Sequence, residues 1–117
     1  MPGQDCTTRR VGAAVVVTMP AEIDAMNAGE IRRVLLSAAG PGVADVIVDM
    51  SGTIFCDSAG VHAVIAAHRH AAETGTRLRL VATTVLRIFA LVGADLLMPI
   101  YGTLDAALAD ARPARDV

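Results

Sequence analysis

The sequence predicts an α/β fold, with a mostly parallel or mixed central sheet of four to five strands and about four helices. Short β-branched runs alternate along the chain with longer segments whose apolar residues recur at helical spacing. This alternation gives a largely parallel sheet with helical crossovers. The chain has 117 residues, which suits one domain, because a core of that size buries about two thirds of the unfolded chain's surface.

The first third of the chain predicts two strands and a helix. Residues 6–11 are expected to form an edge strand, and residues 13–19 hold an apolar run between glycine and proline, which is typical of a buried central strand. Residues 20–26 carry two acids and are expected to form a loop. Asn27 then begins a helix as its N-cap, with Glu30 placed to complete a capping box. A Gly-Pro-Gly sequence ends this helix.

The rest of the chain repeats the alternation of strand and helix. Further strands are expected at residues 46–48, 78–81 and 98–101, and residues 54–56 are expected to be a short extended piece that leads to Asp57. Further helices are expected at residues 57–74, 85–93 and 103–111. Only Arg79 interrupts the apolar pattern of its strand, and the tail from residue 113 is expected to fray.

Composition and charge exclude several classes of function. The formal net charge is −2 and the ten basic residues are all arginines, scattered singly or in pairs, whereas nucleic-acid binding calls for a basic patch. No apolar run approaches the roughly 20 residues that span a bilayer, and the first residues lack a signal-peptide pattern. Cys6 and Cys56 do not make a disulfide framework. We therefore expect a cytoplasmic protein with free thiols, no membrane insertion and no direct contact with nucleic acid.

The most informative segment follows the strand at residues 46–48. It contains the tetrapeptide Asp57-Ser58-Ala59-Gly60 at a helix entry. Asp57 suits an N-cap, which accepts hydrogen bonds from the first free N–H groups of a helix. Ser58 is then expected to point to solvent, and Gly60 to keep this corner low enough for another surface to approach. Taken alone, the tetrapeptide is a common helix cap.

In its context the tetrapeptide resembles the signature of STAS domains, the family of anti-sigma-factor antagonists. Glu22-Ile23-Asp24 is similar to the acidic loop of the family, and residues 75–81 resemble its next strand. The resemblance covers residues 10–110 of a single domain expected to span residues 1–117. The loop departs from the family at Ala21, where glycine is usual.

The resemblance implies a bacterial binding protein that is switched by phosphorylation and is not an enzyme. Unphosphorylated, it would bind an anti-sigma factor, often a serine protein kinase, and so release a sigma factor. The kinase would phosphorylate Ser58, and a serine phosphatase would reverse the modification. The implied partner-binding residues are Asp24, Asp57, Ser58, Ala59 and Gly60, on a monomer or weak dimer. Phosphate at a helix N-terminus would spare the fold but place an uncompensated charge in the interface.

Two other functions stay open. The same fold could serve as a scaffold or regulatory subunit of a stressosome or transporter complex, without control of a sigma factor. An enzyme with Ser58 as its nucleophile would need a base, and no histidine is expected to be placed as one. His68 and His70 point to nearly opposite sides of their helix, and with His62 they predict no metal site. We expect no cofactor.

Several apolar residues outside the motif are expected in the core. Cys56 is interpreted as a small buried hydrophobe, and Met50, Met98, Leu96 and Leu97 as further core residues. Any of the last four that is exposed instead becomes a candidate for a partner surface near the second and third helices.

Overall fold

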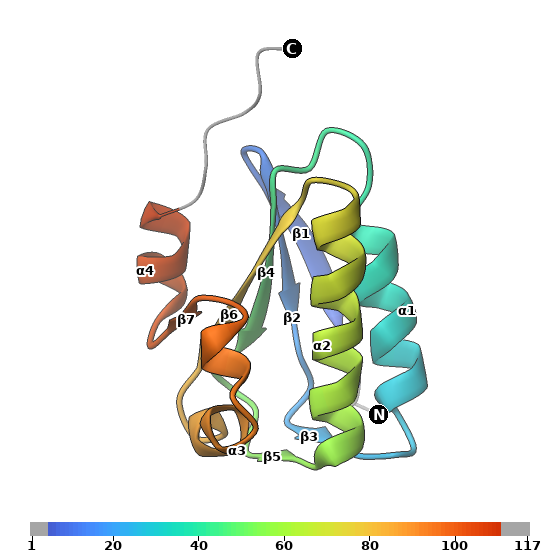
Figure 1. Ribbon diagram of the computed structural model, residues 1–117, viewed down its shortest axis with the longest axis vertical. Coiled ribbons are helices and arrows are strands. Elements are labelled where there is room, and N and C mark those ends of the chain that lie inside the picture. Colours follow the sequence, from blue (N-terminus) through green and yellow to red (C-terminus); the bar gives the residue numbers. More distant parts are fainter. Residues whose placement is uncertain (1–4, 111–117) are drawn as a thin grey trace.

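The computed structural model describes residues 5–110, in which helices cover both faces of a five-stranded sheet (Figure 1). The strand order is β1-β2-β4-β6-β7, with β1 antiparallel to β2 and the other neighbours parallel. These strands are β1 (Thr7–Val11), β2 (Ala14–Thr18), β4 (Asp45–Met50), β6 (Arg77–Ala82) and β7 (Ile100–Tyr101). The predicted α/β class, with a mostly parallel or mixed sheet of four to five strands, is confirmed.

Four α-helices lie within the described residues, as predicted. They are α1 (Ala28–Ala38), α2 (Ser58–Glu73), α3 (Leu86–Leu91) and α4 (Leu104–Ala109). Helices α1 and α2 pack side by side over one face of the sheet, and α4 covers the other face (Figure 1). Gly75 ends α2 and Gly93 ends α3, each with a positive φ that favours glycine. None of the helices in residues 5–110 is both long and apolar enough to cross a bilayer.

A second sheet of two short strands lies where the chain leaves the carboxyl ends of β2 and β4. Strand β3 (Glu22–Ile23) pairs in parallel with β5 (Phe55–Cys56). The expectation that all of residues 20–26 form a loop is therefore wrong. The loop is held as a strand because the Ile23 carbonyl accepts the Asp57 N–H at 3.1 Å and the Ala21 carbonyl accepts the Ile54 N–H at 2.8 Å.

The expected capping box at the start of α1 is also wrong. Asn27 has helical backbone angles, φ −115° and ψ −5°, and its side chain makes no capping hydrogen bond. Instead, its Oδ1 accepts the Asp24 N–H at 3.0 Å and its Nδ2 donates to the Glu22 carbonyl at 2.9 Å. Glu30 pairs with Arg33. Asn27 thus fixes the acidic loop, and α1 begins without a side-chain cap.

The face of the sheet under α4 holds a buried ion pair that the sequence pattern did not predict. Arg79 is fully buried, and its Nε donates to Asp45 Oδ1 at 3.0 Å. Its Nη1 donates to the Tyr101 hydroxyl at 2.7 Å and lies 3.2 Å from the Asp110 carboxylate. Tyr101 also donates to Asp110, the C-cap of α4. This network connects α4 to three strands.

Candidate functional site

The entry to α2 has the geometry predicted for it. Asp57 is the N-cap, with extended backbone angles, and its Oδ1 accepts the N–H groups of Ala59 at 3.0 Å and Gly60 at 3.2 Å. Ser58 is the first residue of the helix and is exposed. A hydroxyl therefore stands at the surface of a helix N-terminus that an anchored carboxylate keeps in place.

Other residues pack closely against Gly60 as predicted, but they belong to β3 and β5 of the same chain and not to a partner. A Cβ at Gly60 would lie 2.6 Å from Cys56 Sγ and 2.6 Å from Ile23 Cγ2, and the residue is buried. The space predicted above Gly60 is thus filled by β3 and β5. Contact of Gly60 with a partner stays a prediction, whereas its packing role follows directly from these distances.

The acidic loop lies beside the entry to α2. Asp24 and Asp57 each follow a strand of the small parallel sheet directly, so the pairing of β3 with β5 places them next to each other. The Asp24 carboxylate accepts the Met26 N–H at 2.9 Å, which orders the turn after β3. Ala21 raises no conformational obstacle, because no non-glycine residue in the described range has a positive φ. The two acids and Ser58 therefore share one corner.

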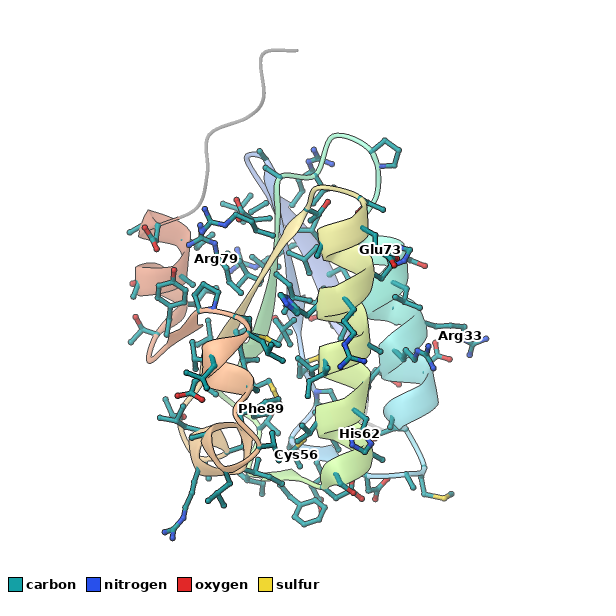
Figure 2. All side chains as sticks on the ribbon, in the orientation of Figure 1. Arg33, Cys56, His62, Glu73, Arg79 and Phe89 are labelled. Carbon is teal, nitrogen blue, oxygen red and sulfur yellow. The ribbon has the colours of Figure 1, made fainter. Side chains whose placement is uncertain are left out.

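The Cys56 thiol lies under this corner and stays protonated at neutral pH. It is buried, and burial together with the neighbouring Asp57 carboxylate raises its pKa to about 11. Cys6 is likewise free, and burial, Asp5 and Glu30 raise its pKa to about 11. The interpretation of Cys56 as a small buried hydrophobe is confirmed (Figure 2).

A groove of about 470 Å³ runs from Ser58 along α2, between this helix and α3. Its polar lining consists of Ser58, His62 and Arg69. Its apolar lining consists of Val61, Ile65, Ala66, Ile88 and Val92. The sequence reasoning missed this groove, although the spacing of the α2 residues marks them as one face of a helix.

His62 lies one turn after Ser58 and lines the same groove, on the surface of α2 (Figure 2). A histidine thus occurs on the same side of α2 as Ser58. No hydrogen bond joins the two side chains among the described residues, and a serine nucleophile requires a base within hydrogen-bond reach. Within residues 5–110 no group of three or more metal-ligating side chains is placed to hold an ion.

Large exposed apolar side chains gather in the segments that follow β2, β4 and β6. The set comprises Met26, Ile54, Phe55, Leu86, Leu91, Val92, Leu96 and Leu97. Met50 and Met98 are buried as expected, but Leu96 is 87% exposed and Leu97 is 50% exposed. The expectation of a core position is wrong for both leucines, because they lie on a 3₁₀ turn, Ala94–Leu96, and the residue after it. Because both leucines are exposed, they become candidates for a partner surface near α2 and α3.

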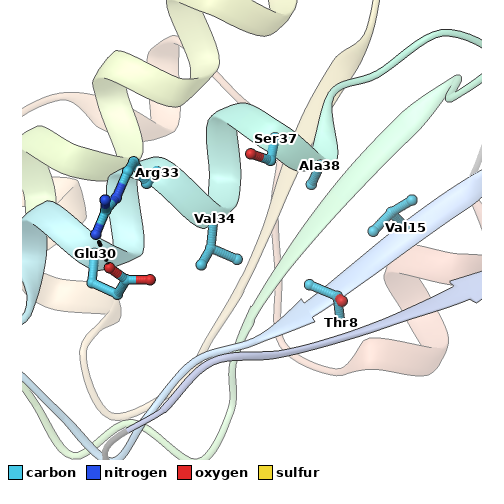
Figure 3. Close-up of a pocket in the computed structure, with 7 residues that line it drawn as sticks. All are labelled: Thr8, Val15, Glu30, Arg33, Val34, Ser37 and Ala38. Carbon is cyan, nitrogen blue, oxygen red and sulfur yellow. Dashed lines mark hydrogen bonds and ion pairs between the residues drawn. The ribbon is translucent and has the colours of Figure 1, made fainter.

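A further hollow of about 510 Å³ lies between α1 and the first two strands (Figure 3). Thr8, Val15 and Val34 line it, and the ion pair of Glu30 with Arg33 lies on its α1 side. It shares no residue with the groove at Ser58, and its two charged groups neutralise each other. It offers no candidate chemistry.

Comparisons with solved structures agree with the fold. The structure of an anti-sigma factor antagonist from Mycobacterium paratuberculosis is similar at 25% identity and TM-score 0.80, covering 92% of this chain and 93% of that chain. The phosphorylated Bacillus cell fate determinant SpoIIAA is similar at 23% identity and TM-score 0.70, covering 92% and 100%. The murine Solute Carrier 26 family member A9 anion transporter matches at 19% identity and TM-score 0.68, covering 86% of this chain but 18% of that one.

Curated protein sequences give no significant match. The family model described as the STAS domain, however, matches residues 6–107. That range includes every strand and the acidic loop, the Asp57-Ser58-Ala59-Gly60 turn and the groove beside it. The chain belongs to the STAS domain family.

Proposed function

We propose that this STAS protein is an anti-sigma-factor antagonist. With Ser58 unphosphorylated, it binds an anti-sigma factor and thereby frees a sigma factor, and phosphorylation of Ser58 ends the binding. The observation that carries this proposal is the exposed hydroxyl of Ser58 at the capped start of α2, bordered by an apolar groove. It is supported by two similar structures, one of an anti-sigma factor antagonist and one of a phosphorylated protein.

The start of α2 can carry a phosphate without unfolding. Phosphorylation adds about −1.5 to −2 charges at neutral pH. The free N–H groups and the dipole of the helix favour negative charge there, by about 0.3–1 kcal/mol when exposed. Asp57 already occupies two of the N–H groups, so the cap persists when Ser58 is modified. We therefore expect the fold to be preserved.

A docked partner, by contrast, would meet an uncompensated charge. The corner holds the carboxylates of Asp24 and Asp57, and a phosphate on Ser58 would add to them. Burying such a charge against an apolar surface costs far more than the helix end returns. In this proposal the partner contacts are Asp24, Asp57, Ser58, Ala59 and Gly60. The covalent steps belong to a serine protein kinase and a serine phosphatase, so the chain itself needs no catalytic group.

The first prediction concerns Ser58→Ala and Ser58→Glu. Binding of each purified variant to the histidine-kinase-like anti-sigma factors encoded in the same genome is measured by calorimetry. We expect Ser58→Ala to bind one of them as the unphosphorylated protein does, and Ser58→Glu to bind it more than about tenfold more weakly, because the carboxylate is desolvated on docking. Ser37→Glu is the matched control, since Ser37 is an exposed helical serine that lies outside the groove.

Equal affinity of the two Ser58 variants would contradict the switch and favour the scaffold or regulatory-subunit role. Mass spectrometry of the protein from its native cells gives an independent check. The proposal requires phosphate on Ser58 in at least one growth condition.

A further inference from the structure

We propose that the groove between α2 and α3 is the docking site for an amphipathic helix of the anti-sigma factor, whose carboxylate pairs with Arg69. This inference rests on the proposed function and extends it from the Ser58 corner to a surface that selects the partner. Three observations support it: the apolar lining of the groove, the positive charge of Arg69 at the far end of the groove, and the distance along α2 between Ser58 and Arg69.

The lining of the groove suits an apolar face. Apart from Ser58, His62 and Arg69, it consists of aliphatic side chains from both helices. Ile65 and Ile88 are only partly buried, each with one side against the core. A groove between two helices, lined in this way, commonly receives the apolar face of a third helix. Leu91, 74% exposed, extends the apolar surface beyond the groove along α3.

The far end of the groove carries the positive charge of Arg69. Arg69 is exposed and forms no ion pair with any residue in the range 5–110. Among the described residues, Arg9, Arg10, Arg32 and Arg87 also form no ion pair. None of these four lines the groove, so Arg69 is the cation that faces an occupant. No acidic side chain lines the groove. A partner carboxylate could therefore pair with Arg69 without displacing an acidic side chain of this protein. Such charge pairing contributes more to specificity than to affinity.

The spacing of the lining residues sets the length of the occupant. Ser58, His62, Ile65, Ala66 and Arg69 follow one another at helical spacing and so share one face of α2. Arg69 lies eleven positions after Ser58 on the helix, a rise of about 16 Å. A partner helix that touches the Ser58 corner at one end thus reaches Arg69 about three turns later. Phosphate on Ser58 would block one end of this site and leave the other unchanged.

The test uses the anti-sigma factor that binds the unphosphorylated protein in the Ser58 experiment. Arg69→Glu reverses the charge at the end of the groove, and Ala66→Phe fills its middle. We expect each variant to bind that protein about tenfold more weakly or worse. Arg9→Glu is the matched control, because it makes the same change of net charge at an exposed site on β1, on another part of the surface. Its affinity should equal that of the wild type.

The folding of the variants is checked by circular dichroism and thermal unfolding, and both substituted positions lie outside the buried core. An arginine placed on the partner helix in exchange for the carboxylate that faces Arg69 should restore binding of Arg69→Glu. That rescue supports the proposal and a simple folding defect would not produce it.

The binding results distinguish a failure of this inference from a failure of the proposed function. A wild-type protein that binds no anti-sigma factor overturns both. A wild type that binds, with Arg69→Glu and Ala66→Phe binding equally well, overturns the groove alone. A wild-type dimer in sedimentation that Ala66→Phe dissociates would assign the groove to a second copy and overturn the proposal.

Discussion

Gly60 is the residue at which the local packing of the site is tightest. It lies in the first turn of α2, where the helix contacts β3 and β5 at the level of Ile23 and Cys56. The absence of a side chain there lets the small sheet approach the helix. The small sheet in turn places Asp24 beside Asp57. The arrangement of this corner therefore depends on the absence of a Cβ atom at Gly60.

The Gly60→Ala variant tests this dependence. Its Cβ would lie 2.6 Å from Cys56 Sγ and 2.6 Å from Ile23 Cγ2, so the sheet or the helix must shift. We expect the free energy of unfolding to fall by about 1–3 kcal/mol, the usual effect of overpacking. Urea unfolding followed by circular dichroism measures it.

Gly29→Ala is the control for that measurement. Gly29 lies in α1, and a Cβ there would meet no atom within 4 Å. Alanine is the better helix former, so this variant should gain about 0.5–1 kcal/mol. A Gly60→Ala protein that gains stability in the same way would show that the contact at Gly60 does not constrain the corner.

At the scale of elements, the Arg79 network holds α4 against the sheet. Arg79 on β6 contacts Asp45 on β4, Tyr101 on β7 and Asp110 at the end of α4. Its guanidinium also lies 5.7 Å from the centre of the Tyr101 ring, within cation–π range. The rest of this face is a small apolar cluster that includes Val16, Ile47 and Ala107. A helix of six residues gains little stability from its own hydrogen bonds, so α4 depends on these contacts.

The Asp45→Ala variant leaves Arg79 buried without its closest carboxylate. Breaking a buried ion pair usually costs about 3–5 kcal/mol. We expect the free energy of unfolding to fall by an amount near the lower end of that range, because the exposed Asp110 carboxylate still lies 3.2 Å from Arg79 Nη1. Glu30→Ala, which removes an exposed partner of Arg33, should cost about 0–1 kcal/mol. Chemical unfolding compares the two, and similar losses in both variants would show that burial adds nothing to the Asp45 pair.

The elements differ in how far the sequence could predict them. The long apolar patterns predicted every strand of the main sheet and every helix to within a few residues. Strands of two residues such as β3 and β5 carry no periodicity, so their pairing could not be foreseen. Arg79 interrupts a strand pattern, and its burial depends on Asp45, 34 positions away. The groove likewise needs two helices whose packing no local pattern describes.

At the scale of the whole molecule, the candidate site and the buried ion network lie on different parts of the fold. The site lies where the chain leaves the carboxyl ends of the parallel strands, and the network lies between the sheet and α4 (Figure 1). Distant sites usually contribute additively to stability. Substitutions in the network should therefore lower stability without changing the specificity of the groove.

The two thiols give the whole molecule a predictable response to alkaline pH. The pKa values of Cys6 and Cys56 are raised from 9.0 to about 11 in the folded protein, mainly by burial. Between about pH 9 and 11 the unfolded chain therefore loses these protons before the folded chain does. Because the folded state then binds more protons, the free energy of unfolding falls as the pH rises through this window.

Urea unfolding at a series of pH values from 7 to 11 measures the fall, which should be absent below about pH 8 and total about 1–3 kcal/mol for each thiol. Burial and the Asp110 carboxylate also raise the pKa of Tyr101 above 10.0, so part of the fall above pH 10 belongs to the tyrosine. The double variant Cys6→Ser, Cys56→Ala separates the contributions, since it keeps the tyrosine and loses both thiols. Its stability is lower at every pH but should decline less between pH 9 and 10. An equal decline in the variant and the wild type would show that the thiols titrate alike in the folded and unfolded chains.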